Sequence, residues 1–385
     1  MFDLVHAGFD TMDIAFSGAL PQEALSVLEK AREVAQERQA KELVSIGPGN
    51  LAMHVAGHVM KGGYAYVTDT GPLGAVWRFK KNADPTQWNI FASPRATMLL
   101  AYGFKGTRER LLAELKAMGA MVTDHSINRV DFAMDFRTQG FKLHMDQFVA
   151  HSHCKITPHW EKKETFTDRN QPTAVIRGRQ FESATIGRQP GRQIIVYDKR
   201  REAIEHQKPF WFAAWGIDRK DPTAEVWRVE VRAGKKELKD KYRISRFEDL
   251  EAGIGDVMVN ALQEVRYLAD RQRDSNVSRQ ALHPLWLAAQ AAVANKLTDY
   301  RSGLTPNQVI EIERTVARDR YAGLVTGNAI GLAVADGLAD EEIMENLPQL
   351  VADYVATAIR ANEAKIAEGI RRTRVRQHFI DQCNI

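Results

Sequence analysis

Three short runs of this chain carry residue types that could perform phosphoryl chemistry: carboxylates, arginines and a tyrosine. The runs are residues 128–136, 192–200 and 227–232. Carboxylate oxygens are the ligands that Mg²⁺ and Mn²⁺ prefer, and arginines bind phosphates through paired hydrogen bonds. A tyrosine hydroxyl is a nucleophile once its proton is removed. If the three runs lay side by side, these groups could hold a divalent metal and a phosphate around one point.

Each run is predicted to be a β-strand, because apolar and polar residues alternate and a period of two puts them on opposite faces. The polar faces comprise Arg129, Asp131 and Asp135 in the first run, and Arg228, Glu230 and Arg232 in the third. In the second run, Tyr197 and Lys199 share a face with Gln193 and Ile195. We expect the three polar faces to converge on one sheet.

The expected chemistry is attack of Tyr197 on a phosphodiester. A tyrosine with a pKa near ~10 is a poor nucleophile at neutral pH, and Lys199 on the same face is expected to lower that pKa. Mg²⁺ or Mn²⁺ held by Asp131 and Glu230, with Asp135 as a third candidate ligand, would polarise the phosphodiester. The product would be a phosphotyrosyl bond, which conserves the energy of the broken linkage and so permits rejoining.

Composition bounds the class of protein. The 385 residues are enough for two domains, and 44% hydrophobic content suits a globular chain with a sizeable core. No apolar run of about 20 residues predicts a membrane span, and two distant cysteines, Cys154 and Cys383, indicate free thiols in a reducing cytoplasm. Residues 171–245 contain 17 Lys and Arg against 10 Asp and Glu, which favours a polyanionic partner.

The pattern predicts an α+β fold, with a central antiparallel β-sheet and flanking helices over residues 1–245. An all-helical domain for DNA binding or assembly is predicted over residues 246–385. Residues 62–103 are predicted to be an antiparallel meander whose last strand is 98–102, and residues 143–151 a helix. The last predicted helix carries a basic cluster that could contact DNA, formed by Arg371, Arg372, Arg374 and Arg376.

The order of the motifs resembles the replication initiation factor family. The resemblance rests on Arg129-Val-Asp-Phe-Ala-Met-Asp-Phe, then Ala184-Thr-Ile-Gly-Arg followed by Arg192-Gln-Ile-Ile-Val-Tyr-Asp-Lys-Arg, then Trp227-Arg-Val-Glu. Members of this family are rolling-circle initiators of the transesterase type from plasmids and phages, with related relaxases of conjugative elements. The similarity covers roughly residues 8–245.

This resemblance implies a site- and strand-specific DNA nicking and closing enzyme that acts on single-stranded or extruded origin DNA. Tyr197 would take the 5′ phosphate and leave a free 3′ hydroxyl, Asp131 and Glu230 would form the acidic metal site, and Lys199 would assist. A host helicase, a homodimer and a cytoplasmic location are further expectations. The predicted DNA-binding residues are Arg129, Arg188, Arg192, Arg228 and Arg232.

Alternative interpretations stay open at this point. Arginines and carboxylates at this spacing also form cross-strand ion pairs on a sheet face, which would suit a non-catalytic DNA-binding replication or segregation factor. A hydrolytic nuclease using the same acids is a second alternative. The tyrosines that compete with Tyr197 for the role of nucleophile are Tyr64, Tyr66, Tyr102, Tyr242 and Tyr267.

Other motifs are weaker candidates. The residues considered as metal ligands are the pair His151 and His153, the trio His153, Cys154 and His159, and the pair His54 and His58 at helical spacing. The aromatic segment 210–215 could stack on unpaired bases or could anchor a hydrophobic surface.

Overall fold

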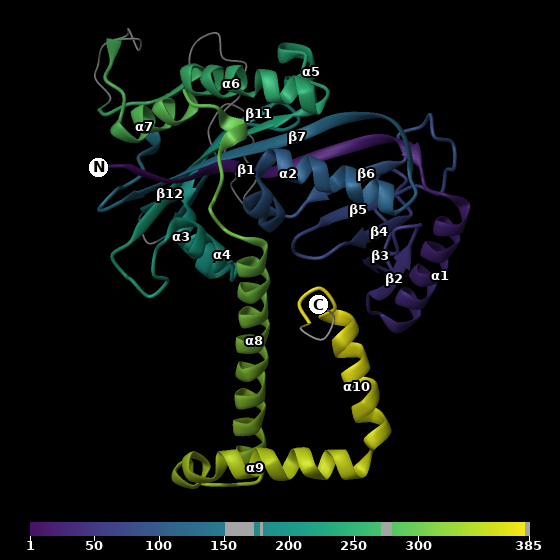
Figure 1. The fold of residues 1–385 in the computed structure, drawn as a ribbon. Coiled ribbons are helices and arrows are strands. Elements are labelled where there is room, and N and C mark those ends of the chain that lie inside the picture. Colours follow the sequence, from purple (N-terminus) through teal and green to yellow (C-terminus); the bar gives the residue numbers. More distant parts are fainter. Residues whose placement is uncertain (151–172, 178–179, 271–278, 382–385) are drawn as a thin grey trace, which may run out of the picture. The chain divides into compact units, whose positions relative to one another are not determined.

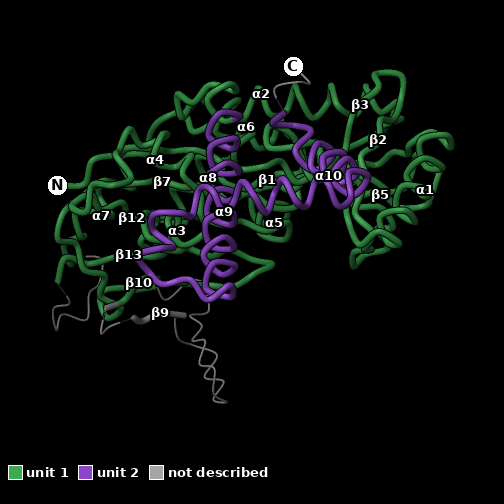
Figure 2. Tube along the Cα trace, turned by 90° about the horizontal axis from the view of Figure 1, so that it is seen from below, with its two compact units in different colours: residues 1–309 green, residues 310–385 purple. Residues whose placement is uncertain are grey.

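The computed structural model describes residues 1–150, 173–177, 180–270 and 279–381. The chain divides into two compact units, Met1–Val309 and Ile310–Ile385 (Figure 2). Unit 1 contains a large antiparallel sheet with flanking helices, and unit 2 is helical (Figure 1). The predicted α+β fold class with a helical C-terminal region is confirmed.

Within the described ranges, eleven strands form the main sheet, and every neighbouring pair in it is antiparallel. In spatial order they are β2 (Glu42–Ile46), β3 (Leu51–Val55), β4 (Tyr66–Asp69), β5 (Ala75–Phe79), β6 (Ile90–Pro94), β1 (Asp3–Ala19), β7 (Met121–Thr138), β12 (Glu225–Gly234), β11 (Arg192–Asp198), β10 (Gln180–Gly187) and β9 (Thr173–Arg177). The long strands β1 and β7 lie at the centre and join the two halves of the sheet.

The three predicted motif strands are neighbours in space, in the order β7, β12, β11. Their register aligns Asp135 with Arg228 and Arg228 with Tyr197, so the three side chains lie in one row across the strands. Because side chains alternate between faces, the polar sides of the three strands share one face of the sheet. The expected convergence is therefore confirmed.

The opposite face carries the hydrophobic core. Side chains such as Trp77, Phe132 and Val229 are fully buried there, under helices that also contribute to the core. These helices are α1 (Gln22–Arg38), α2 (Ala96–Ala117), α5 (Lys235–Tyr242), α6 (Phe247–Glu264) and α7 (Pro284–Val293). The polar face meets two short helices, α3 (Lys199–Glu205) and α4 (Phe210–Trp215), and the indole of Trp215 bonds to Asp135 on β7.

Two predicted elements are wrong. Residues 98–102 lie inside α2 rather than in a strand, and Met98, Leu99 and Leu100 are all buried there. A short apolar run buried on several sides has no periodicity that separates strand from helix. Residues 143–150 are not an α-helix: they form a 3₁₀ turn, η1 (Met145–Gln147), and strand β8 (Phe148–Ala150), which pairs with β13 (Val265–Tyr267).

The compact units divide after Val309, whereas the sequence places the domain boundary near residue 245. The intervening residues include α6, α7 and the 3₁₀ turn η3 (Leu297–Asp299). Their apolar side chains, including Phe247, Leu250 and Trp286, are buried in the core of unit 1. A helical pattern does not reveal whether a helix packs on its own kind or on a sheet, which is why the two divisions differ.

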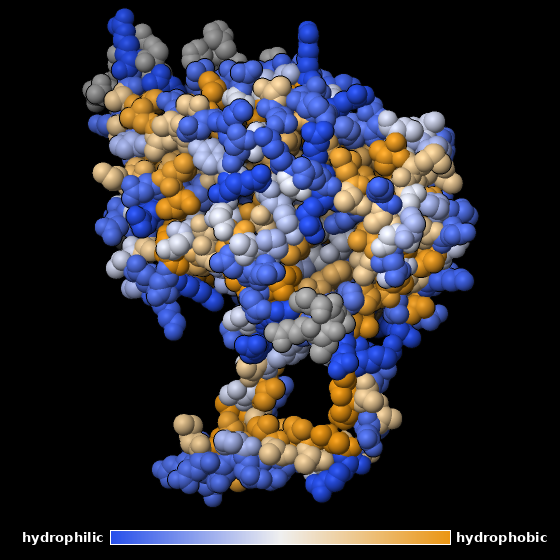
Figure 3. Space-filling view, in the orientation of Figure 1, coloured by the Kyte–Doolittle hydropathy of each residue, from blue (hydrophilic) through white to orange (hydrophobic). Residues whose placement is uncertain are grey.

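Unit 2 exposes much of its apolar surface. Its helices are α8, which starts in unit 1 (Pro306–Ala335), α9 (Asp340–Ala361) and α10 (Glu363–Arg376). Large apolar side chains are exposed along them (Figure 3), namely Leu324, Val325, Ile330, Leu332, Val334, Met344, Val355, Ile359 and Ile370. Among the described residues, no helix is long and apolar enough to span a membrane.

Candidate functional site

Tyr197 is hydrogen-bonded directly to one of the predicted acids. Its hydroxyl donates to Glu230 Oε2 at 3.0 Å. Tyr197 lies near the end of β11, and Glu230 lies in the middle of β12. The tyrosine is half-buried and the glutamate is buried. Strand alternation explains the contact, because Tyr197 and Glu230 lie diagonally on adjacent strands of one face.

Asp131 completes this group from the neighbouring strand β7. Arg232 Nε lies 2.6 Å from Glu230 Oε1 and 3.6 Å from Asp131 Oδ2, so the two carboxylates flank a single guanidinium. Arg129 donates to both oxygens of Asp131, at 2.8 and 2.6 Å. The two arginines are about one-third exposed, at 33% and 31%. We call Tyr197, Glu230, Asp131, Arg129 and Arg232 the open cluster.

Burial and mutual repulsion shape the electrostatics of the open cluster. Burial raises the pKa of the Asp131 carboxyl to about 6; Arg129 opposes this rise and the negative charge of Glu230 adds to it. Burial also raises the pKa of the Tyr197 hydroxyl well above its ordinary value, against the effect of Arg228. The phenol is therefore protonated at neutral pH.

Lys199 does not act as predicted on Tyr197. It is the first residue of α3 rather than a strand residue, and its Nζ lies 2.7 Å from Glu202 Oε2. Burial, helped by Arg228, lowers the pKa of Lys199. Its Nζ lies 5.6 Å from the centre of the Tyr197 ring, so the two residues are close, yet the pKa of Tyr197 is raised rather than lowered.

A second cluster lies on the same face, under α4. Arg228 donates to Asp135 from Nε at 2.5 Å and from Nη2 at 2.8 Å, and to Asp10 Oδ1 on β1 at 2.7 Å. Trp215 Nε1 also donates to Asp135, at 2.8 Å, and the Trp211 ring lies 4.1 Å from the guanidinium carbon. Arg228 and Asp135 are fully buried. We call Asp10, Asp135 and Arg228 the covered cluster.

Asp10 and His6, both on β1, are site residues that the sequence interpretation missed. Arg228 holds the pKa of Asp10 below its ordinary range although burial opposes this. Burial lowers the pKa of His6 to about 4, and its Nδ1 is buried without a hydrogen-bond partner. The sequence did contain a signal, an interruption of the alternation between apolar and polar residues. Phe9 and Met12, three positions apart, both face the core, because the strand register shifts between Phe9 and Thr11.

Two predicted DNA-binding arginines lie apart from both clusters. Arg192 has the strand parity of the core residues Ile194 and Val196, and its buried guanidinium pairs with Glu264 and Glu237 on the helical side. Arg188 is exposed in the turn between β10 and β11. Arg228 is also inaccessible to a phosphate, because its side chain is 0% exposed.

The predicted metal ligands fit a divalent ion only in part. Asp131 and Glu230 come together on either side of the Arg232 guanidinium, so two carboxylates are available to a cation. Asp135 belongs to the covered cluster, where Arg228 and Trp215 occupy both of its oxygens. Within the described residues, no three His, Cys, Asp or Glu side chains are grouped to hold a metal ion.

The weaker sequence candidates do not join the site. The aromatic segment 210–215 forms α4, and its rings are buried against the covered cluster rather than free to stack on bases. His54 is buried in β3, so the helical spacing to His58 is not realised. The histidines and cysteine at 151–159 lie outside the described residues.

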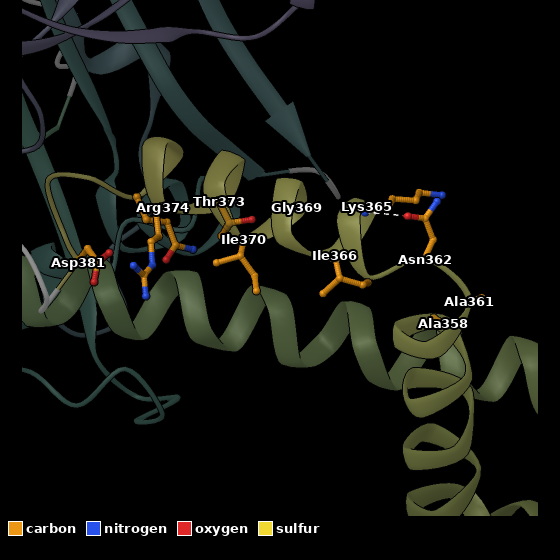
Figure 4. Close-up of a pocket in the computed structure, with 11 residues that line it drawn as sticks. Ala358, Ala361, Asn362, Lys365, Ile366, Gly369, Ile370, Thr373, Arg374 and Asp381 are labelled. Carbon is orange, nitrogen blue, oxygen red and sulfur yellow. Dashed lines mark hydrogen bonds between the residues drawn. The ribbon is translucent and has the colours of Figure 1, made fainter.

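Unit 2 contains a pocket of about 930 Å³ lined by α9, α10 and Asp381 (Figure 4). Arg374 of the predicted basic cluster lines it, beside Ile366 and Ile370. Two other members of that cluster, Arg371 and Arg372, donate to Glu368, so part of the basic charge is satisfied within α10.

Comparisons with known proteins give a distant structural similarity. No family model matches the chain, and no curated protein matches it in sequence. A solved structure of a rolling circle replication initiator protein from Geobacillus stearothermophilus is similar over 78% of this chain and 99% of that chain, with 14% sequence identity and a TM-score of 0.38. Values this low carry no argument about function, which must rest on the residues themselves.

Proposed function

We propose that this protein nicks and rejoins single-stranded DNA through a covalent bond to Tyr197, in the manner of an initiator of rolling-circle replication or transfer. The observation that carries the proposal is the 3.0 Å hydrogen bond from the Tyr197 hydroxyl to Glu230, beside Asp131 and two arginines that are about one-third exposed. The resemblance of the three motifs to replication initiation factors supports it. The three motif strands are also neighbours.

In the proposed reaction, Glu230 is the general base. Because burial raises the pKa of Tyr197, the phenol keeps its proton until the transition state, and Glu230 Oε2 is already placed to accept it. The tyrosine oxygen bonds to phosphorus, the bond from phosphorus to the 3′ oxygen breaks, and that oxygen takes a proton from water. Arg232 and Arg129 would bind the phosphate oxygens.

Mg²⁺ or Mn²⁺ remains part of the proposal, with Asp131 and Glu230 as its protein ligands and Asp135 excluded. A bound ion would supply Lewis-acid polarisation of the phosphodiester. The arginines that now pair with the two acids would bind the phosphate instead, so that each charge keeps a partner.

A second candidate is a DNA-binding replication factor without catalysis. It is favoured by the charge compensation within the open cluster: each carboxylate oxygen of Asp131 and Glu230 accepts a hydrogen bond from Arg129, Arg232 or Tyr197. In that case the open cluster would only stabilise the fold, and the protein would bind DNA through its basic residues without cleaving it.

The test is a cleavage assay with single-stranded oligonucleotides tiled across the DNA that flanks the gene, with Mn²⁺ present. Wild type should give a protein–DNA adduct that survives denaturing electrophoresis, Tyr197→Phe should give none, and the matched control Tyr242→Phe should keep it. An adduct that persists in Tyr197→Phe contradicts the assignment of the nucleophile. Binding without an adduct selects the non-catalytic factor, and free 5′ phosphate ends select a hydrolytic nuclease.

A further inference from the structure

The polar face of the sheet continues beyond the open cluster, across β1 to β6 and β5. Arg78 Nη1 donates to Ser93 Oγ at 3.0 Å, and Ser93 Oγ donates to Asp13 Oδ1 at 2.5 Å. Asp13 lies opposite Arg129 in the β1–β7 register. Arg129 then bonds to Asp131, so contacts and register link β5 to the open cluster without a break.

Two aromatic rings and two cations gather at the far end of this row. Tyr64 and Phe91 meet edge to face, with ring centres 5.9 Å apart. The Arg78 guanidinium lies 5.1 Å from the Phe91 ring centre, and Lys80 Nζ lies 5.4 Å from that of Tyr64. All four side chains are partly exposed. We call these four residues the aromatic platform.

The aromatic platform is not explained by core packing. On β5 the core residues are Trp77 and Phe79, which are almost fully buried, while Arg78 and Lys80 alternate with them and face the other way. The same holds for Phe91 between the buried Ile90 and Ala92. Rings that lie outside the core with cations beside them offer both a stacking surface for bases and a charge for phosphates.

We propose that the aromatic platform is a binding subsite for single-stranded DNA, and that the bound strand follows the polar face from the platform to the open cluster. The inference rests on the proposed function, because it assigns the path of the strand that Tyr197 attacks. Charge complementarity identifies the occupant: the cations Arg78, Lys80, Arg129 and Arg232 line the path and outnumber its acids, Asp13, Asp131 and Glu230. Partly exposed aromatic rings favour unpaired bases over a duplex.

The experiment measures binding of a fluorescent oligothymidylate of about 20 nucleotides to the full chain, since stacking on aromatic side chains tolerates any base. Phe91→Leu keeps an apolar side chain but removes the stacking surface, and should weaken binding about tenfold. Arg78→Gln should weaken binding and reduce the slope of log affinity against log salt by about 0.7. Lys30→Gln, an exposed lysine on α1 across the sheet, is the matched charge control and should change the slope little.

The outcomes separate this inference from the proposed function. In the adduct assay, Phe91→Leu should raise the DNA concentration needed for half-maximal rate about tenfold and leave the rate at saturation unchanged. If wild type forms the adduct but Phe91→Leu and Arg78→Gln bind DNA like the control, the proposed subsite at the aromatic platform is wrong and the nicking proposal stands. Wild type that binds DNA through the platform but forms no adduct overturns the nicking proposal alone. Equal weakening of duplex binding by the two variants would also overturn the assignment to single strands.

Discussion

The open and covered clusters share an arrangement of carboxylates and arginines on β7 and β12, and they differ in what lies over them. Both pair carboxylates with arginines at alternate positions of β7 and β12. In the covered cluster, α4 places Trp211 and Trp215 on the ion pair, and Arg228 is 0% exposed. In the open cluster the two arginines keep about one-third of their surface.

This difference teaches that charge pattern on a strand does not by itself indicate function. A fully buried ion pair is held by its geometry and is costly to break, whereas a partly exposed one can exchange partners with a ligand. The covered cluster therefore acts as a structural tie between β1, β7 and β12. The open cluster has the access that a reacting phosphate requires.

The largest expected effect comes from removing the central cation of the covered cluster. Arg228→Met leaves Asp135 and Asp10 uncompensated in a buried site, and should lower the free energy of unfolding by about 3–5 kcal/mol. Arg129→Met in the open cluster should cost about 1–2 kcal/mol, because water reaches that pair. Urea denaturation measures both, and similar losses in the two variants would contradict the contrast between the clusters.

Two of the aspartates of β7, Asp131 and Asp135, should change the stability with pH in opposite directions. The folded pKa of Asp131 is raised to about 6, so its ionised form costs stability above that pH, and the cost vanishes below its unfolded pKa of about 3.9. Asp131→Asn should therefore raise the free energy of unfolding at pH 8 by about 3 kcal/mol, by the conversion of pKa shift to free energy. The gain should fade as the pH falls from 6 to 4.

Asp135 is the matched control for that prediction. Arg228 lowers its folded pKa although burial opposes this, so its ionised form stabilises the fold above the unfolded pKa, and this stabilisation is lost as the pH falls through the folded value. Asp135→Asn should destabilise at pH 8, by about 3 kcal/mol for a buried pair, and the loss should shrink in acid. Denaturation curves from pH 2 to 8 that slope the same way for both variants would show the assignment to be wrong.

The smallest expected effect is stabilisation by a divalent ion. Mn²⁺ at about ten times its dissociation constant should add about 1.4 kcal/mol to the free energy of unfolding. Glu230→Gln should abolish this increment and Asp135→Asn should retain it, since only the first removes a proposed ligand. Thermal unfolding with and without Mn²⁺ measures the increment, and its loss in both variants would return Asp135 to the metal site.

Part of this contrast could be predicted from the sequence. Alternation in the three motif runs identified the strands and the polar sides of β7 and β12, and the structure makes these strands neighbours. Alternation puts Arg192 on the side of Ile194 and Val196, but it did not show that Glu237 and Glu264 would pair with its guanidinium there. Alternation also did not distinguish Asp135 from Asp131, because only the fold shows that α4 covers Asp135 and not Asp131.

Other features escaped for the same physical reason, that burial depends on distant parts of the chain. Asp10 enters the covered cluster through a register shift in β1 and a contact with Arg228, 218 residues away. The helices at 247–264 and 284–293 have an ordinary amphipathic pattern, yet their apolar sides complete the core of unit 1. Periodicity therefore predicts helices, strands and their buried faces, but it does not predict which distant segments pack against those faces.

The order of the strands sets a fixed interval on the polar face. Four steps between neighbouring strands separate β6, which carries Phe91, from β11, which carries Tyr197, and at ~4.8 Å per step they place the two residues roughly 20 Å apart across the sheet. A rigid hydrogen-bonded lattice, unlike a loop, keeps such an interval constant. The protein would therefore measure out a defined length of DNA before the nick, and its footprint would be a property of its β-topology rather than of any base it recognises.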